Sequence, residues 1–357
     1  MWKKFILGVK KVRVLHILNT SSYSGAENVA ITIIKELEKD KNYEVYYVSP
    51  RGKIEKKLKE EGIKYIPINK LCVKELKRVI KEYKPDVIHA HDFRASIISS
   101  IATSRNIKII SHVHCNPDWI KKINAYSIAY AMCSIRYKSI LLVSKAIKEE
   151  YIFSNIIKDK CQVMGNFIDV ENIKEKSRKI ENNKLYDICF CGRLSEEKNP
   201  IKFINLIKNI KKQEKNVTAA IIGDGKLKKQ CVNLIKTENL EKNITLYGFL
   251  ENPYCIINNC KVLCMTSKWE GYGLVAVEAL ALEKPVVATN VGGIPTIIDD
   301  SCGKICDDNK SMEDEIIKLL TDEDYYKKKS QKAREKLNKI NNPIQYVKKL
   351  KKVYEEN

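Results

Sequence analysis

Short apolar runs rich in valine and isoleucine alternate along this chain with amphipathic charged segments, and this alternation constrains the fold more than any other feature. The intervening segments, such as 26–39 and 73–83, carry apolar residues at helical spacing. Strands alternating with helices indicate a parallel sheet covered on both faces. The first series of apolar runs is 12–18, 43–48, 65–68, 86–90, 108–113 and 139–144.

The alternation restarts in the second half of the chain. Residues 170–185 are polar and charged and are interpreted as a linker. A chain of 357 residues is also too long for one ordinary core. We therefore expect an α/β fold of two domains, with parallel sheets facing across a cleft and ligands at the carboxyl ends of the strands. The second series of strands is 187–191, 218–222, 244–247, 261–265 and 285–288.

The last segment, 343–355, is expected to form a helix that packs on another part of the chain. Its apolar side chains fall on one helical face. Those side chains are Tyr346, Val347, Leu350, Val353 and Tyr354.

The net charge of +21 admits two readings. It reflects either a general excess of lysine or attraction to an anionic membrane surface. Nucleic acid is disfavoured, because the basic residues are not interleaved with aromatic ones. No run is long enough to span a bilayer, and the N-terminus, residues 1–11, lacks the features of a signal peptide. We expect a cytoplasmic protein.

The twelve cysteines do not predict a metal or disulfide framework. They contain no Cys-x-x-Cys pair. Most lie within apolar runs, where cysteine behaves as a small hydrophobic residue.

Two carboxylates, Glu270 and Glu278, are the strongest functional candidates. Glu270 precedes a Gly-Tyr-Gly turn that opens a helix, and such a turn can hold a phosphate. Glu278 lies among apolar residues of that helix and therefore needs a hydrogen-bond partner. An anion site flanked by acceptors for hydroxyl groups indicates a sugar nucleotide. The alternative is one turn acid and one solvated helix acid.

Three further loops follow predicted strands. Arg193 and Lys198 suit a diphosphate, although such a pair carries little weight alone in a chain with 65 basic residues. Gly223 in Gly-Asp-Gly permits close approach of a ligand or simply ends a strand. Gly25 belongs to a loop that is not Gly-x-Gly-x-x-Gly, which disfavours a nicotinamide or flavin site. A plain strand-to-helix turn remains the alternative there.

The histidines are considered in pairs. For His112 and His114 we expect side chains on opposite faces of an extended segment, which makes them poor co-ligands, and no metal site is predicted. His114 lies at the start of a loop, which favours a functional role. His89 and His91 repeat this spacing and rank lower.

Taken together, these motifs resemble the retaining GT-B glycosyltransferases of family 4. The resemblance runs from about residue 12 to the C-terminus. It implies two Rossmann-like domains, 1–168 for the acceptor and 169–340 for the nucleotide sugar, with 341–357 crossing back to the first domain. The motifs, in chain order, are Ser24-Gly25-Ala26-Glu27, Gly192-Arg193-Leu194-Ser195-x-x-Lys198, Gly223-Asp224-Gly225, Glu270-x7-Glu278, 285–288 and Gly292-Gly293-Ile294-Pro295.

The resemblance also implies roles for individual residues. Arg193 and Lys198 would bind the donor diphosphate, Glu278 the ribose hydroxyls and Glu270 the transferred sugar. His114 would contact the donor sugar near the reaction centre. The remaining donor-binding positions would be Gly25, Asn166, Gly223, Gly271, Tyr272, Gly273 and Leu274.

Two positions depart from the family pattern. Phe167 stands where the family usually has a glycine after the asparagine matched by Asn166. Ser24 replaces one of the two glycines that the first loop often contains.

The resemblance therefore predicts a retaining, hexosyltransferase-type enzyme that needs no cofactor and no obligatory metal. It would move a sugar from a nucleoside diphosphate sugar, UDP-linked, to a glycan or lipid-linked acceptor in cell-surface polysaccharide biosynthesis. Its place would be the cytoplasm, peripheral on the inner face of the plasma membrane. The alternatives are a degenerate nucleotide-sugar-binding protein and, disfavoured by the first loop, an NAD-dependent oxidoreductase.

Overall fold

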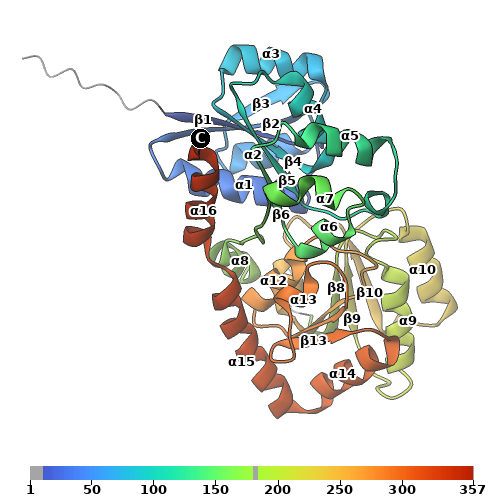
Figure 1. Ribbon diagram of the computed structural model, residues 1–357. Helices are drawn as coiled ribbons and strands as arrows, with labels where there is room; N and C mark the ends of the chain where they lie inside the picture. Colours follow the sequence, from blue (N-terminus) through green and yellow to red (C-terminus); the bar gives the residue numbers. More distant parts are fainter. Residues whose placement is uncertain (1–10, 180–183, 357) are drawn as a thin grey trace, which may run out of the picture. The chain divides into compact units, whose positions relative to one another are not determined.

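The computed structural model describes residues 11–179 and 184–356, which form two compact units (Figure 1). Unit 1 comprises 1–167 and 343–357, and unit 2 comprises 168–342. The N-terminal residues 1–10, for which no signal peptide was predicted, lie outside the described residues.

Unit 1 is built on a seven-stranded sheet in the order β3-β2-β1-β4-β5-β6-β7, with every neighbouring pair parallel. One set of its side chains forms a buried aliphatic core, which explains the short apolar runs in the sequence. The strands are β1 Val12–Ile17, β2 Tyr43–Pro50, β3 Tyr65–Ile68, β4 Val87–His91, β5 Lys108–Val113, β6 Ser139–Leu142 and β7 Cys161–Val163.

Helices connect these parallel strands. The last helix belongs to unit 1 although it follows unit 2 in the sequence. The helices are α1 Gly25–Glu38, α2 Ile54–Glu60, α3 Val73–Tyr83, α4 Asp92–Ala102, α5 Ala125–Ser134, α6 Lys145–Glu150, α7 Ser154–Ile157 and α16 Pro343–Glu355; short 3-10 turns occupy Asp118–Lys121 and Lys158–Lys160.

Helix α16 packs on unit 1 through the apolar face that its sequence predicts. The five predicted side chains, 346, 347, 350, 353 and 354, are its buried residues. Polar contacts hold it as well: Lys351 Nζ lies 2.5 Å from Asp40 Oδ2, and Tyr43 Oη donates to Glu355 Oε1 at 2.5 Å.

Unit 2 has a six-stranded parallel sheet in the order β10-β9-β8-β11-β12-β13, the strand order of a dinucleotide-binding fold. The predicted pair of parallel-sheet α/β domains is confirmed. The strands are β8 Tyr186–Cys191, β9 Ala219–Ile222, β10 Ile244–Gly248, β11 Cys260–Met265, β12 Val286–Thr289 and β13 Gly303–Cys306. The helices are α8 Val170–Ser177, α9 Pro200–Ile210, α10 Lys228–Thr237, α11 Tyr254–Asn258, α12 Leu274–Ala281, α13 Ile294–Ile297, α14 Asn309–Thr321 and α15 Glu323–Ile340.

The interpretation of 170–185 as a linker is wrong for its first half. Helix α8 occupies that stretch, and the Asp169 side chain caps it by accepting from the Asn172 backbone N–H at 3.1 Å. Only Ile173 of this helix is buried, so the sequence lacks a repeating apolar stripe. The helix forms because it packs against α11 and α12.

In both sheets, the connections leave on opposite sides at one pair of strands. These switch points lie between β1 and β4 in unit 1 and between β8 and β11 in unit 2. Loops that follow such strands form a crevice at the carboxyl edge, where open α/β sheets bind ligands. All the loops singled out in the sequence follow strands, and several flank these two points.

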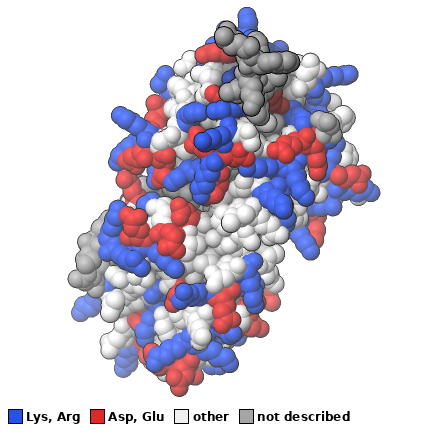
Figure 2. All heavy atoms as spheres, turned by 90° about the vertical axis from the view of Figure 1, so that its left-hand side faces the viewer, with Lys and Arg blue, Asp and Glu red and all other residues white. Residues whose placement is uncertain are grey.

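Acidic and basic side chains interleave over the face shown in Figure 2. Ion pairs join elements of unit 1, such as that of Arg13 with Glu44 at 2.7 Å. Within the described residues, no helix has the length and apolar character needed to cross a membrane.

Candidate active site

The loops after β8 and β9 of unit 2 lie against one another. Gly223 has φ +144°, and a Cβ atom there would come within 1.9 Å of the Gly192 carbonyl oxygen. A Cβ on Gly225 would come within 2.4 Å of the Leu194 carbonyl oxygen. The glycines of Gly-Asp-Gly are therefore required by the close approach of two backbones, whatever else they contact.

The two charged residues predicted from separate motifs, Lys198 and Glu270, form an ion pair. Lys198 Nζ donates to Glu270 Oε2, which also accepts from Ser267 Oγ at 3.3 Å. Both side chains are largely buried. Thr266 Oγ1 ties the two loops by donating to the Asn199 carbonyl at 2.9 Å. The switch point between β8 and β11 thus holds one cation and one carboxylate in contact.

Arg193 is held differently. Its guanidinium lies 3.3 Å from Glu197 Oε1 and is more than half exposed. An exposed ion pair of this kind contributes little to stability, so Arg193 can leave Glu197 for a more strongly binding anion. Arg193 is therefore available to a ligand at the carboxyl edge of unit 2.

The Gly-Tyr-Gly turn after Glu270 is built by a second glycine pair further along the chain. Gly273 adopts φ +103° and precedes α12, as predicted for a turn that opens a helix. Gly292 has φ +56°, and a Cβ there would lie 1.6 Å from the Glu270 carbonyl oxygen. The loop after β12 therefore passes directly beneath Glu270, and only glycine fits at that point.

Glu278 is buried within α12 and has the partner that its apolar surroundings demand. Tyr254 Oη, from α11, donates to Glu278 Oε1 at 3.2 Å. Burial raises the pKa of Glu278 to about 7, and the Tyr254 hydrogen bond opposes this rise. The Cys191 thiol at the end of β8 has a raised pKa, mainly through burial, with Glu278 raising it further and Lys198 lowering it. Both charges are therefore near the end of β8.

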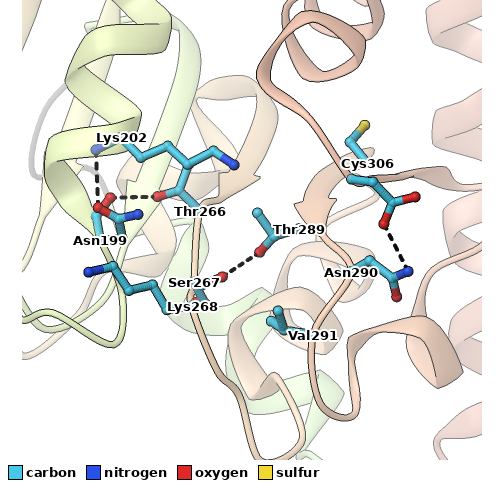
Figure 3. A pocket seen from close by; sticks show the side chains of 10 residues that line it. Asn199, Lys202, Thr266, Ser267, Lys268, Thr289, Asn290, Val291 and Cys306 are labelled. Atoms are coloured by element: carbon cyan, nitrogen blue, oxygen red, sulfur yellow. Dashed lines mark hydrogen bonds between the residues drawn. The ribbon is translucent and has the colours of Figure 1, made fainter.

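A cavity of about 220 Å³ opens at the carboxyl edge of the same sheet (Figure 3). Thr289 Oγ1 donates across it to the Ser267 carbonyl at 2.7 Å, and Asn290 Nδ2 donates to Asp307 Oδ1 at 3.0 Å. The lining includes Asn199, Ser267 and Lys268, the chain neighbours of Lys198 and Glu270, but not Lys198, Glu270 or Glu278 themselves.

All five histidines of the chain form one cluster at the carboxyl edge of unit 1, across the switch point between β1 and β4. His91 links two others: its Nε2 lies 2.9 Å from His16 Nδ1, and its Nδ1 lies 2.8 Å from His114 Nε2. A second series of hydrogen bonds joins Tyr354 Oη to His89 Nδ1 at 2.6 Å and His89 Nε2 to His112 Nδ1 at 3.1 Å. His89 and His91 stack, with ring centroids 4.5 Å apart.

The prediction that His112 and His114 project from opposite faces is wrong. Residues i and i+2 of an extended segment share a face, and these two ring centroids are 4.1 Å apart. The ligand nitrogens of two triads, His16/His89/His91 and His91/His112/His114, lie within 4.8 Å of one another and are close enough to hold a transition metal. In this structure, several of those nitrogens are instead engaged in the hydrogen bonds between rings.

The cluster is electrically neutral. Burial lowers the pKa of His16 and of His114 to about 3. Burial, and then the neighbouring histidines, lower the pKa values of the other three histidines well below their ordinary range. A neutral imidazole has one N–H and one lone pair, so His91 must donate to one neighbour and accept from the other. His16, His91 and His114 thus form a hydrogen-bonded row. Its two end atoms, His16 Nε2 and His114 Nδ1, are buried without a hydrogen-bond partner among the described residues.

Two carboxyl groups that were assigned no role from the sequence support this edge. Asp92 has φ +68°, an uncommon conformation for a non-glycine residue, and its Oδ1 accepts from the His114 backbone N–H at 2.9 Å. Burial raises the pKa of Asp92 to about 6. Glu27, also buried, accepts from Thr20 Oγ1 at 2.5 Å and from Ser24 Oγ, which closes the loop before Gly25.

Asn166 lies at the C-terminal end of the first part of unit 1. Its side chain is buried, and its Oδ1 atom has no hydrogen-bond partner among the described residues. Phe167, the residue that departs from the family pattern, packs its ring against Tyr346 of α16 at a centroid distance of 4.7 Å. A buried acceptor without a donor is costly, which marks Asn166 as a position for a ligand donor.

The sequence therefore identified the charged residues of unit 2 but not their supports. Tyr254 and Ser267 carry no motif, and a partner for Glu278 could be demanded but not named. The five histidines could have been grouped from their places in neighbouring strands, since β1, β4 and β5 are adjacent and the i, i+2 pairs share a face.

Comparison with known proteins follows the division into two units. Residues 23–172 match the family model described as Glycosyltransferase Family 4, and residues 169–336 match that described as Glycosyl transferases group 1. An uncharacterized glycosyltransferase of Methanocaldococcus jannaschii, MJ1059, is 30% identical over 286 residues, which cover 70% of each chain. CapM of Staphylococcus aureus, a capsular polysaccharide biosynthesis glycosyltransferase, is 27% identical over 347 residues, covering 88% of this chain and 89% of CapM.

The fold is shared with HepE of Anabaena, whose crystal structure contains UDP. The TM-score is 0.82 at 18% identity, and the match covers 95% of this chain and 98% of HepE.

Proposed function

The chain belongs to the group 1, family 4 glycosyltransferases, and on that premise we propose that it transfers a sugar, with retention of configuration, from a UDP-linked donor to a glycan or lipid-linked acceptor of a cell-surface polysaccharide. The observation that carries the proposal is the contact of Lys198 with Glu270 at the switch point of unit 2, beside a glycine turn that opens α12.

The donor diphosphate takes Lys198 and Arg193 as its cations. Arg193 offers a planar fork and Lys198 a point charge, and both stabilise the negative charge that develops as the sugar–phosphate bond breaks. Binding displaces Lys198 from Glu270. The freed carboxylate then accepts hydrogen bonds from hydroxyl groups of the transferred sugar. The UDP found in HepE supports the choice of nucleotide.

Glu278 is proposed to bind the ribose of the donor. Its pKa of about 7 means that it is half protonated near neutrality, and hydroxyl donors from a ribose favour the ionised form. Donor binding therefore draws a proton off Glu278. Gly25, Asn166, Gly223, the backbone of 271–274 and His114 take the donor-binding roles that the family resemblance gives them.

The acceptor belongs to a surface polysaccharide, which is supported by the relationship to CapM. The peripheral membrane location is supported by the net charge of +21.

Two measurements test the proposal. Thermal shifts with UDP, GDP and ADP sugars are expected to show stabilisation by the UDP class alone. Glu270→Gln is expected to lower sugar transfer about 10²- to 10³-fold. The matched control is Glu196→Gln, whose carboxylate pairs with Lys268 on the exposed rim. Equal transfer by Glu270→Gln and wild type would overturn the site, and donor binding without turnover over a broad acceptor panel would indicate a degenerate binding protein.

A further inference from the structure

Helix α5 of unit 1 carries its apolar side chains on the outside. Met132 and Ile135 are 68% and 77% exposed, and Ile123, just before the helix, is 71% exposed. Tyr126 and Ile128 are exposed as well. The spacing 128, 132, 135 places these three side chains on one stripe of the helix.

The inward face of α5 is the more polar one. Ser127 and Ser134 are fully or almost fully buried, and their hydroxyls donate to backbone carbonyls, Ser134 Oγ to Ala131 at 2.6 Å and Ser127 Oγ to Lys122 at 2.9 Å. The Tyr130 hydroxyl bonds Ser111 Oγ at 2.8 Å. A helix facing water normally shows the reverse arrangement. The inward polarity is satisfied by hydrogen bonds, whereas the outward apolar stripe is left bare.

The neighbouring helices extend this surface. Helix α5 packs against α4 and α7, as Figure 1 shows. Ile101 of α4 and Ile156 of α7 are 57% and 58% exposed. Scattered exposed apolar residues are ordinary, but exposed apolar side chains on three helices that pack together indicate an interaction surface.

Basic residues outnumber acidic ones in the chain segments around this surface. Residues 93–148 contain nine basic residues and a single acidic one, Asp118, whereas the whole chain has 65 basic and 44 acidic residues. Lys160 Nζ donates to the Ser134 and Ile135 carbonyls at 2.9 and 2.8 Å, so a cation stands at the C-terminal end of the stripe. Lys122 and Lys121, the latter paired with Glu150 at 3.5 Å, stand at the other end.

We propose that this α5 surface docks the protein onto an anionic lipid bilayer, with Met132 and Ile135 entering the interface and the flanking lysines facing lipid phosphates. An apolar stripe with cations at both ends matches the two layers of such a surface, acyl chain and headgroup. A second copy of this chain fits less well, because two such faces would bring like charges together. The inference rests on the proposed function only in supposing that the acceptor is met at a membrane.

The test is sedimentation with vesicles made of equimolar phosphatidylglycerol and phosphatidylcholine, compared with phosphatidylcholine alone. The wild-type chain is expected to sediment with the anionic vesicles and not with the neutral ones. Its binding is expected to weaken as the salt concentration rises. Met132→Glu combined with Ile135→Glu is expected to lower the partition coefficient about tenfold or more. Both positions are exposed, so these changes leave the core intact.

The matched control is Leu185→Glu combined with Phe249→Glu, two exposed apolar positions in unit 2. This variant is expected to bind vesicles as the wild type does. Binding that survives the α5 changes, or falls equally in the control, overturns the proposal. So does a wild-type dimer, seen by sedimentation equilibrium, that only the α5 changes dissociate.

Thermal shift with UDP sugars on the same variants separates the two proposals. The α5 variant is expected to respond to donor as the wild type does. Loss of vesicle binding with an intact donor response supports the docking surface. An intact vesicle interaction without any donor response would leave the docking surface standing and count against the proposed function.

Discussion

The two sheets of this protein carry polar side chains at the same topological place, but in opposite electrostatic states. At the switch point of unit 2, a lysine and a glutamate make a charged contact between two loops. At the switch point of unit 1, four buried histidines within adjacent strands and the half-buried His114 just beyond β5 form a neutral array. One fold therefore supports either kind of edge.

The difference lies in where the side chains originate. Lys198 and Glu270 come from loops beyond the strand ends, where part of each side chain reaches water and a charge is tolerated. Four of the five histidines lie within the strands themselves, where burial makes an imidazolium ion costly. Only the edge of unit 2, whose charged side chains come from loops, can offer a charge to a phosphate. The edge of unit 1, whose histidines come mostly from strands, offers oriented neutral donors and acceptors.

The largest expected effect comes from removing the cation of unit 2. Lys198→Ala is expected to lower sugar transfer about 10²- to 10³-fold, because the leaving diphosphate loses a stabilising charge. Steady-state transfer assays measure it. Lys332→Ala, which removes the exposed partner of Glu335 on α15, serves as the control and is expected to retain activity. Comparable losses in both variants would mean that the loss at Lys198 is not specific to its position.

The neutral edge is tested by stability. His91→Leu leaves His16 Nδ1 and His114 Nε2 buried without partners and is expected to cost about 2–4 kcal/mol. His16→Leu leaves only His91 Nε2 without its partner, and it also removes the unpartnered His16 Nε2. Its cost is therefore expected to stay below about 1 kcal/mol. Amide hydrogen exchange of β4 and β5 measures both. Equal costs would contradict the row of hydrogen bonds.

The same edge predicts a response to acid. Because the folded-state pKa values of these histidines are lowered, the unfolded chain binds more protons once the pH falls below about 6.5. Protection of β4 and β5 is therefore expected to fall between about pH 6.5 and pH 3. Protection that is unchanged over this window would contradict the neutral state.

Glu278 gives a pH-dependent effect of opposite sign in unit 2. Its raised pKa means that the folded chain holds a proton that the unfolded chain has lost, so stability falls as pH rises from about 4.5 to about 7. The Glu278→Gln variant has no carboxyl group at this position and does not lose this stability as the pH rises. We expect the variant to match the wild type at pH 5 and to exceed it by about 2–3 kcal/mol at pH 8, at 1.36 kcal/mol per pKa unit. Denaturant unfolding at both pH values measures the gap, and a gap independent of pH would refute it.

The smallest expected effect is that of chelation. Since the ring nitrogens of the histidine cluster bond one another, removing metal by EDTA is expected to leave the melting temperature and the transfer rate unchanged. Elemental analysis of the purified chain provides the check. One equivalent of bound zinc, lost together with stability on chelation, would turn the cluster into a metal centre.

The local spacing of apolar residues predicted much of this structure. The apolar runs predicted most strands because a doubly covered sheet buries both faces of every strand, as in β1 and β12. The face of α16 could be read from five apolar residues at helical spacing. The strands β7 and β13 were missed because they are short and carry few apolar side chains, so their pairing depends on the neighbouring strand.

The candidate site divides in the same way. Lys198 and Glu270 could be singled out from their motifs, and Glu278 could be said to need a partner. That the partner is Tyr254, and that Lys198 and Glu270 touch, follows from the packing of distant segments. The misplacement of His114 had a different origin, since the period of a strand places residues i and i+2 together.

Residue type and spacing were enough to specify the parallel-sheet architecture, the loops that flank the switch points and the charged residues that those loops carry, because hydrophobic period and turn glycines act over a few residues. The ionisation of Glu278, the neutral array of five histidines and the bare apolar face of α5 emerged only in the folded chain. Each depends on desolvation or on contacts between residues far apart in sequence, and neither quantity exists until the strands and helices have packed.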